Sequence, residues 1–206
     1  IRPSRGLGDV YKRQGPTCVM SYALNKTMLD GGYGRLDHHA MQMMKIAIDE
    51  VTIRACHIKV TCPNGTNFEG TTIAPSVHRG EVIINRFPLG ISQPILNDGF
   101  CGKAVLTNYL TPTGSLTYDP EYLAIDTPVT AHFEGNRITG FTGAPDMVAA
   151  VEAHYADVAA RFGLDAYNID SWHAGFHPLM AYEGSATADP LRWSGTAFQH
   201  QRILHF

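Results

Sequence analysis

The spacing of apolar residues predicts an amphipathic helix over roughly 36–50. Its apolar side chains recur three or four residues apart, at Met41, Met44, Ile48 and Val51. Asp37 precedes the first turn, where its carboxylate can accept a hydrogen bond from a free backbone N–H. A methionine-rich stripe is typical of a helix face that packs in a core, so we expect these side chains to be buried.

A second helix is predicted farther along the chain. Its apolar residues again share one face, at Met147, Val151, Tyr155, Val158 and Phe162. Asp146 marks the start of this helix, and Gly163 marks its end.

Other segments show the period of two that is typical of β-strands. Residues 56–62 alternate in this way, and the turn signal Pro63–Asn64–Gly65 leads into another short extended stretch. The runs 81–85 and 103–109 are also rich in residues that favour strands. We therefore expect a series of short strands after the first helix.

The segment 128–141 is typical of a β-hairpin. Two alternating stretches meet at Gly135–Asn136, and these turn residues accept the positive φ that a tight hairpin requires. We expect a polar loop at 184–195, which is rich in Gly, Ser, Ala, Asp and Pro. The apolar run 202–206 has no turn or polar tail after it, so we expect the domain to continue beyond it.

These patterns predict an α+β fold: a mostly antiparallel β domain with a packed helix, preceded by the remnant of an α/β domain. We assign residues 55–206 to the C-terminal domain, expected to be truncated, and residues 15–54 to the N-terminal remnant. Residues 1–14 resemble an in-frame translation of a sequencing-library adapter, which recurs at the edges of metagenomic assemblies. We expect this segment to be non-native and exclude it from the fold.

Charge narrows the classes of partner. The whole chain carries a net charge of −3, and without its basic first 14 residues the remainder carries about −6. An acidic chain without a basic cluster argues against a nucleic acid or an anionic membrane as partner. No apolar run approaches the ~18 residues needed to cross a bilayer.

Cysteine usage bears on the compartment. The four cysteines, Cys18, Cys56, Cys62 and Cys101, form no C-x2-C pair, which argues against a zinc ribbon. Their even number would allow disulfides, but a chain of this size has enough core residues to fold without them. We favour free thiols in a reducing cytoplasm.

Histidine is the residue whose positions suggest chemistry. His173 and His177 follow a predicted strand, His205 lies on the last apolar run, and His78 lies in a loop before a strand. A metal site needs neutral imidazoles on rigid elements, usually with a carboxylate. Histidines at such places are also common as ordinary core or loop residues, so their spacing leaves both interpretations open.

Five segments, in order, resemble a superfamily that joins 2,5-dihydroxypyridine 5,6-dioxygenases to thermophilic (aminopeptidase T-type) dinuclear metallo-aminopeptidases. Residues 59–68 resemble its strand–turn element, and 76–81 resemble the loop that holds a functional histidine in the dioxygenases. The hairpin 128–141 resembles its strand pair, and 171–178 resemble a metal-ligand segment. Residues 204–206 resemble the opening of its His-x-Asp metal motif. Together the segments span about three quarters of the chain.

The resemblance implies particular roles for these residues. His173 and His205 would bind Fe(II), and an aspartate at position 207 would be the third ligand. The family's ligand segment is two residues longer between its histidine and the following proline, so His177 remains an alternative to His173. His78 would act on the substrate hydroxyl as acid/base. Candidates for the wall of the substrate pocket are Trp172, Phe176 and Tyr182.

The implied enzyme is a mononuclear non-haem iron dioxygenase that cleaves a small dihydroxylated (N-hetero)aromatic with dioxygen. Its parent protein would be a homo-oligomer. One alternative is an aminopeptidase with a Zn, Co or Mn pair, for which Glu81 resembles a ligand. The other is a non-catalytic binding domain whose histidines are structural.

Overall fold

A computed structural model describes residues 19–21, 26–72, 85–112, 118–201 and 203–206. It confirms the expected α+β fold with a mostly antiparallel sheet. The helical elements are α2 (Lys26–Asp30), α3 (Gly32–Arg35), α4 (His38–Arg54), the 3-10 turn η1 (Asn97–Gly99), α5 (Pro145–Phe162) and α6 (Pro190–Ala197). The strands are β1 (Val19–Ser21), β2 (Ile58–Thr61), β3 (Asn67–Gly70), β4 (Asn85–Phe87), β5 (Ile95–Leu96), β6 (Phe100–Leu110), β7 (Leu123–Glu134), β8 (Arg137–Thr142), β9 (Ser171–Ala174) and β10 (Leu204–His205).

The largest sheet is antiparallel, with strand order β2-β3-β6-β7-β8. Two of its connections are the predicted turns. Gly65, between β2 and β3, has φ +107°, and Gly135, between β7 and β8, has φ +57°. Both conformations favour glycine because it has no Cβ. The expected hairpin is therefore confirmed, and β7 begins five residues earlier than the pattern predicted.

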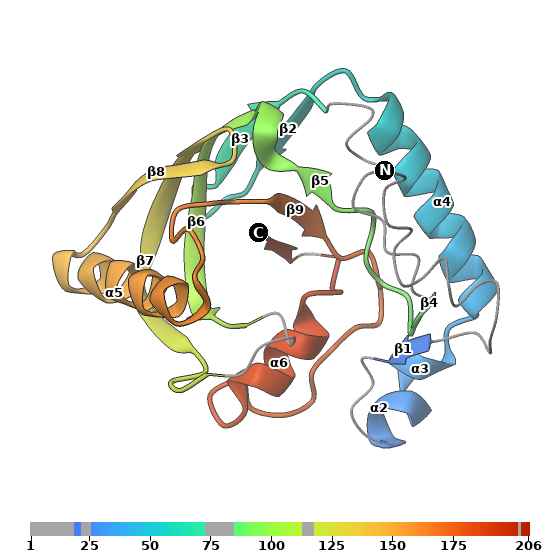
Figure 1. Ribbon diagram of the computed structural model, residues 1–206. Coiled ribbons are helices and arrows are strands. Elements are labelled where there is room, and N and C mark those ends of the chain that lie inside the picture. Colours follow the sequence, from blue (N-terminus) through green and yellow to red (C-terminus); the bar gives the residue numbers. More distant parts are fainter. Residues whose placement is uncertain (1–18, 22–25, 73–84, 113–117, 202) are drawn as a thin grey trace, which may run out of the picture.

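Helix α5 confirms the second predicted helix. Pro145 occupies the first turn, where a missing N–H costs nothing, and Gly163 ends the helix in the left-handed conformation. The helix packs on β7 and β8, with Val151 fully buried. In Figure 1 it lies at one side of the molecule, and α4 lies at the opposite side.

Aromatic side chains fill the core against the large sheet. The ring of Phe68 on β3 lies 5.2 Å from Trp172 on β9 and 5.5 Å from Phe133 on β7, both in edge-on geometry. Phe100 contacts the same tryptophan at 5.3 Å. Edge-to-face pairs are the favoured arrangement of aromatic rings. This cluster therefore fixes β9 to the sheet.

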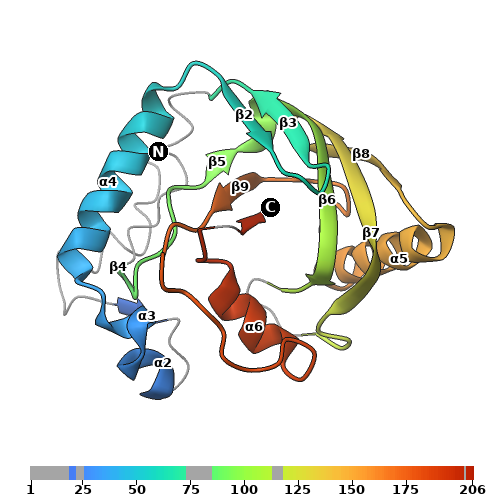
Figure 2. The ribbon, with the colours of Figure 1, turned by 180° about the vertical axis from the view of Figure 1, so that it is seen from behind.

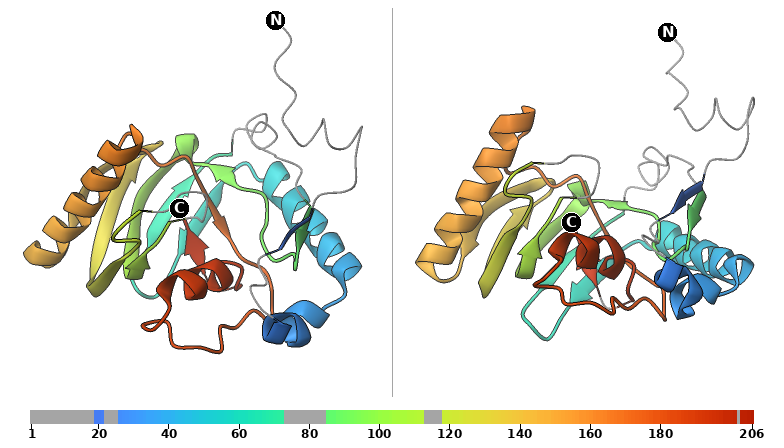
Figure 3. Two further views of the ribbon diagram at one scale, coloured as in Figure 1. Left: turned by 60° about the horizontal axis from the view of Figure 1, so that its bottom comes forward. Right: turned by 90° about the horizontal axis from the view of Figure 1, so that it is seen from below.

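Strand β9 is the centre of a small antiparallel sheet with order β10-β9-β5. Figures 1 and 2 show β9 and the C-terminal segment between the large sheet on one side and α4 on the other. Figure 3 shows α6 next to the C-terminal segment. Strands β5 and β10, which are far apart in the sequence, thus both pair with β9.

The expectation of a loop over 184–195 was partly wrong, because helix α6 begins at Pro190. The side chain of Asp189 accepts a hydrogen bond from the backbone N of Arg192 at 3.0 Å. A carboxylate cap followed by proline is a helix-start signal. The small residues around it, such as Gly195, obscured that signal.

Helix α4 confirms the first predicted helix, with Asp37 capping Ala40 N at 2.8 Å. The expected burial of its stripe was only half right. Met41 is buried and Ile48 packs beside it, but the exposed fractions of Met44 and Val51 are 42% and 72%. Two neighbouring side chains on the helix, Met43 and Ile46, are also exposed.

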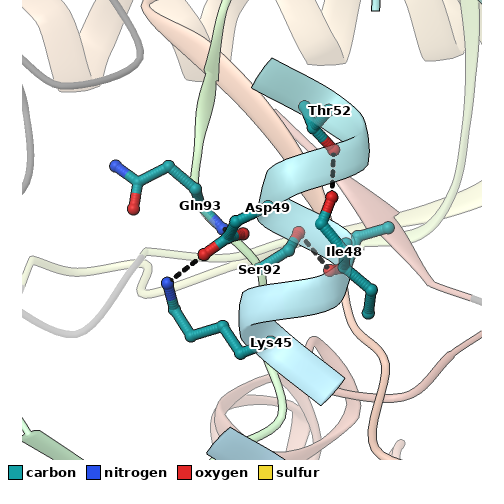
Figure 4. Close-up of polar contacts among 7 residues, drawn as sticks. Lys45, Ile48, Asp49, Thr52, Ser92 and Gln93 are labelled. Atoms are coloured by element: carbon teal, nitrogen blue, oxygen red, sulfur yellow. Dashed lines mark hydrogen bonds and ion pairs between the residues drawn. The ribbon is translucent and has the colours of Figure 1, made fainter. Parts of the chain in front are cut away.

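Polar contacts attach α4 to the segment that precedes β5 (Figure 4). Asp49 accepts a hydrogen bond from Gln93 N at 2.9 Å and forms an ion pair with Lys45. Ser92 donates to the carbonyl of Ala174 on β9 at 3.3 Å. The helix is thus linked through residues 92–93 to β9. Among the described residues, no helix is both long and apolar enough to cross a bilayer.

Candidate metal centre

The short β9–β10 pairing brings the rings of His173 and His205 into contact. The two residues are direct partners in the antiparallel register, and their ring centroids lie 3.7 Å apart with an interplanar angle of 67°. Successive strand residues point to opposite faces. On β9, Trp172 points into the aromatic core, so His173 points away from it. Phe206 contacts the same core, and His205 therefore lies on the opposite face, beside His173.

The environment keeps His205 neutral. Burial, and secondarily the neighbouring His173, lower the pKa of His205 to about 3. Its Nδ1 is buried and has no hydrogen-bond partner in the described part of the chain. A buried polar atom without a partner is uncommon in native proteins. A neutral imidazole with a free nitrogen lone pair is the form that binds metals.

Phe198 contacts one member of this histidine pair. Its ring centroid lies 5.4 Å from that of His205, nearly perpendicular to it. Phe198 follows the last residue of α6, so this helix, part of which lies where a loop is expected from the sequence, positions the apolar neighbour of His205. An isolated phenylalanine after a polar segment carries no pattern from which this contact could be predicted.

His177 has a different environment from the pair. Its side chain is fully buried, its Nε2 donates to the carbonyl of Tyr33 at 3.2 Å, and its Nδ1 accepts from Leu179 N at 3.2 Å. These partners fix the neutral tautomer with the proton on Nε2. Burial lowers the pKa of His177. With both ring nitrogens hydrogen-bonded within the chain, this alternative ligand is less suited to a metal than His173.

The three aromatic residues expected to form one substrate pocket lie in three different environments. Trp172 belongs to the core cluster of the large sheet, and Phe176 packs with Met41 and Leu89. Tyr182 lines a cavity of about 210 Å³ together with residues of α2 and α3. Trp172 and Phe176 are thus core residues, because each is more than nine-tenths buried by apolar neighbours.

His78 and Glu81 lie in the segment 73–84, outside the described residues. Within the described residues, no three His, Cys, Asp or Glu side chains are close enough to hold a metal together. The described part of the centre is therefore a pair of imidazoles, and a complete site requires a further ligand.

The pair suits a borderline divalent cation such as iron or zinc, which imidazole nitrogens bind. Metal–nitrogen bonds of about 2.1 Å separate the centroids of two bound imidazoles by roughly 4.5–5 Å. The rings, now 3.7 Å apart, would therefore have to open by about 1 Å. Comparisons of this chain with protein-family models, curated proteins and solved structures gave no match.

Proposed function

We propose that this chain carries part of the metal site of a mononuclear non-haem Fe(II) ring-cleaving enzyme. The substrates of this dioxygenase-like activity would be a small dihydroxylated (N-hetero)aromatic and dioxygen. The observation that carries the proposal is the contact between His173 and His205, at 3.7 Å between ring centroids. Its support is twofold: the neutral state of His205, whose Nδ1 is buried, and the ordered sequence resemblance of five segments, two of which contain these histidines.

The donor set fits ferrous iron. Two histidines and one carboxylate on one face of Fe(II) are a known arrangement with open positions for other ligands. In the proposal His173 and His205 supply the two nitrogens, and a carboxylate two residues after His205 supplies the oxygen. When bound, iron would hold dioxygen and the hydroxylated ring at neighbouring positions.

The chain's own residues would contribute binding and proton transfer. His205 would bind the cation without first losing a proton, since burial lowers its pKa to about 3. Phe198 would place an apolar ring against His205. His78 would accept the proton of the substrate hydroxyl, because histidine titrates near neutral pH.

The metal ligands can be tested by adding residues after Phe206. One version of the chain receives an added Asp-Gly-Gly tail after Phe206, and the matched control receives Asn-Gly-Gly, so that in both the terminal α-carboxylate lies beyond the tested side chain. We expect the aspartate version to bind Fe(II) or Co(II) at least about tenfold more tightly, since only the carboxylate completes the donor set. His173→Ala and His205→Ala should each abolish that gain. Equal affinity of both extended chains would refute the ligand assignment.

Exposed thiols must be blocked in these titrations. Cys56, Cys62 and Cys101 are free and exposed, and thiolates bind the same metals. Alkylation of all thiols before the titration removes this competing site. The free thiols also support our proposal that the protein works in the reducing cytoplasm.

Activity separates the proposed enzyme from its alternatives. The aspartate-extended chain is loaded with Fe(II) without oxygen and is then transferred to aerated buffer. It should consume oxygen when a dihydroxypyridine is added, and the same chain with His205→Ala should not. Release of leucine from a chromogenic amide with Co(II) or Zn(II), without oxygen uptake, would instead favour the aminopeptidase. Metal binding with neither activity would favour a non-catalytic domain.

A further inference from the structure

The β9–β10 pairing that brings His173 and His205 together is too short to fix its own register. Strand β10 contributes only two residue pairs to β9, Leu204 with Ala174 and His205 with His173. A slip by one residue would turn His205 to the opposite face of the strand, because side chains alternate along it. Some other contact must therefore fix the register of these two strands.

A buried hydrogen-bond network joins the segment after β9 to α3. The backbone N of His177 donates to the carbonyl of Gln199 at 3.0 Å. The amide Nε2 of Gln199 donates to the hydroxyl of Tyr33 on α3 at 2.8 Å, and His177 Nε2 donates to the carbonyl of Tyr33 at 3.2 Å. The exposed fractions of Tyr33, His177 and Gln199 are 4%, 0% and 1%. Three segments distant in the sequence thus meet at one polar centre.

Close packing also holds Gln199 against the end of β9 and the segment of Gly90. A Cβ atom on Gly175 would lie 2.1 Å from the carbonyl carbon of Gln199. A Cβ on Gly90 would lie 2.7 Å from Cβ of His177 and 2.8 Å from Oε1 of Gln199. Only glycine allows this approach. The position of Gln199 relative to β9 is therefore tightly restricted.

Gln199 precedes His205 by one short turn of chain. Between them the carbonyl of Ile203 accepts a hydrogen bond from Gly175 N at 3.3 Å, so the chain is held to the end of β9 at Ile203 as well as near Gln199. The position of Gln199 therefore helps to set which residue of β10 lies opposite His173, together with the packing of Leu204 and Phe206 in the aromatic core.

We propose that Gln199, anchored through its amide to the hydroxyl of Tyr33, is a positioning residue that fixes the register in which His205 lies opposite His173. The inference rests on the proposed metal site, which gives this register its function. A merely structural role for Gln199 would predict that any loss on substitution is a loss of stability alone.

A double variant separates positioning from stability. In Gln199→Met with Tyr33→Phe, the donor and the acceptor of this buried hydrogen bond are removed together, which costs less than removing one of them. The anchor itself is nevertheless gone. We expect the double variant to unfold at a temperature near that of the wild type, whereas Gln199→Met alone, which removes only the donor to the Tyr33 hydroxyl, should unfold earlier.

The readout is the distance between the two histidine rings in the metal-free protein. With histidine-labelled protein, the wild type should show a nuclear Overhauser effect between the ring protons of His173 and His205. In the double variant this signal should be lost, and Co(II) affinity of the aspartate-extended chain should fall at least about tenfold. Tyr33→Phe alone should give an intermediate signal, which keeps the test decisive if the double variant unfolds.

Thr66→Val is the matched control. Thr66 is also buried, and its hydroxyl accepts a hydrogen bond from Val105 N at 2.9 Å in the large sheet. This variant should lose stability and keep the ring signal and the Co(II) affinity. A double variant that retains both would overturn the inference. If the aspartate-extended chain shows the ring signal and binds no metal, the proposed function is overturned, whereas loss of the signal in the double variant still supports the positioning role.

Discussion

Acid should destabilise this protein through His205, and the size of the effect follows from its burial. The folded pKa of this imidazole is lowered to about 3 by burial and by His173, whereas an unfolded histidine has a pKa of about 6.5. The unfolded chain therefore binds a proton that the folded chain does not. Above about pH 6.5 the ring is neutral in both states, and His205 does not lower the free energy of unfolding. As the pH falls from there toward the folded pKa of about 3, the free energy of unfolding decreases.

The magnitude can be worked out at a convenient pH. At pH 5 the unfolded ring is about 1.5 pH units below its pKa and is mostly protonated, while the folded ring stays neutral. One pKa unit corresponds to about 1.4 kcal/mol, so the free energy of unfolding should fall by about 2 kcal/mol between pH 7.5 and pH 5. This is a substantial share of the ~5–15 kcal/mol that stabilises an ordinary domain.

Urea unfolding of the metal-free protein at both pH values measures the loss. Burial also lowers the pKa of His177 and of His154, so the informative quantity is the difference between the wild type and His205→Gln. We expect the wild type to lose about 2 kcal/mol more than this variant. His39→Gln, at an exposed position on α4, should behave as the wild type does. Equal losses in the wild type and His205→Gln would refute the burial of a neutral ring.

Three further predictions concern stability, each measured as the free energy of unfolding in urea. Phe68→Ala should cost about 3–5 kcal/mol, because it leaves a cavity among four aromatic rings, and a cost below about 1 kcal/mol would contradict the central place of Phe68 in the core. Gly163→Ala should cost about 1 kcal/mol, because the φ of this residue is +66°. Gly195→Ala should instead stabilise by about 0.5–1 kcal/mol, because Gly195 lies within α6 and a Cβ there would meet nothing. Effects of the same sign would be inconsistent with this account. Asp49→Ala should cost about 1–3 kcal/mol by leaving Gln93 N without its acceptor, and Asp49→Asn, which keeps an acceptor oxygen, should cost clearly less.

Elements with local signals were predictable from the sequence. Helix α5 has proline in its first turn and a left-handed glycine at its end, and the β7–β8 hairpin has its turn at Gly135. These features depend on residues a few positions apart. The stripe of α4 was predicted correctly as a helix face, but periodicity does not show which edge of a broad apolar stripe meets the core.

The candidate site depends on contacts that no local pattern encodes. His173 and His205 are far apart in the sequence, and only the strand register makes them neighbours. Their pairing was expected from a family resemblance and not from spacing. Gln199 and Tyr33 are single polar residues without a motif, so their network became visible only in the folded chain.

The exposed methionines of α4 affect how the protein has to be handled. Met43 and Met44 expose about half of their side chains to solvent, beside exposed Ile46. Sulfate and similar salts strengthen the attraction between such uncovered apolar groups, so concentrated ammonium sulfate should promote self-association. Peroxide formed when ferrous iron meets air would convert these thioethers to sulfoxides and make the helix surface more polar. Reconstitution with iron should therefore be followed by mass spectrometry for added oxygen on this helix.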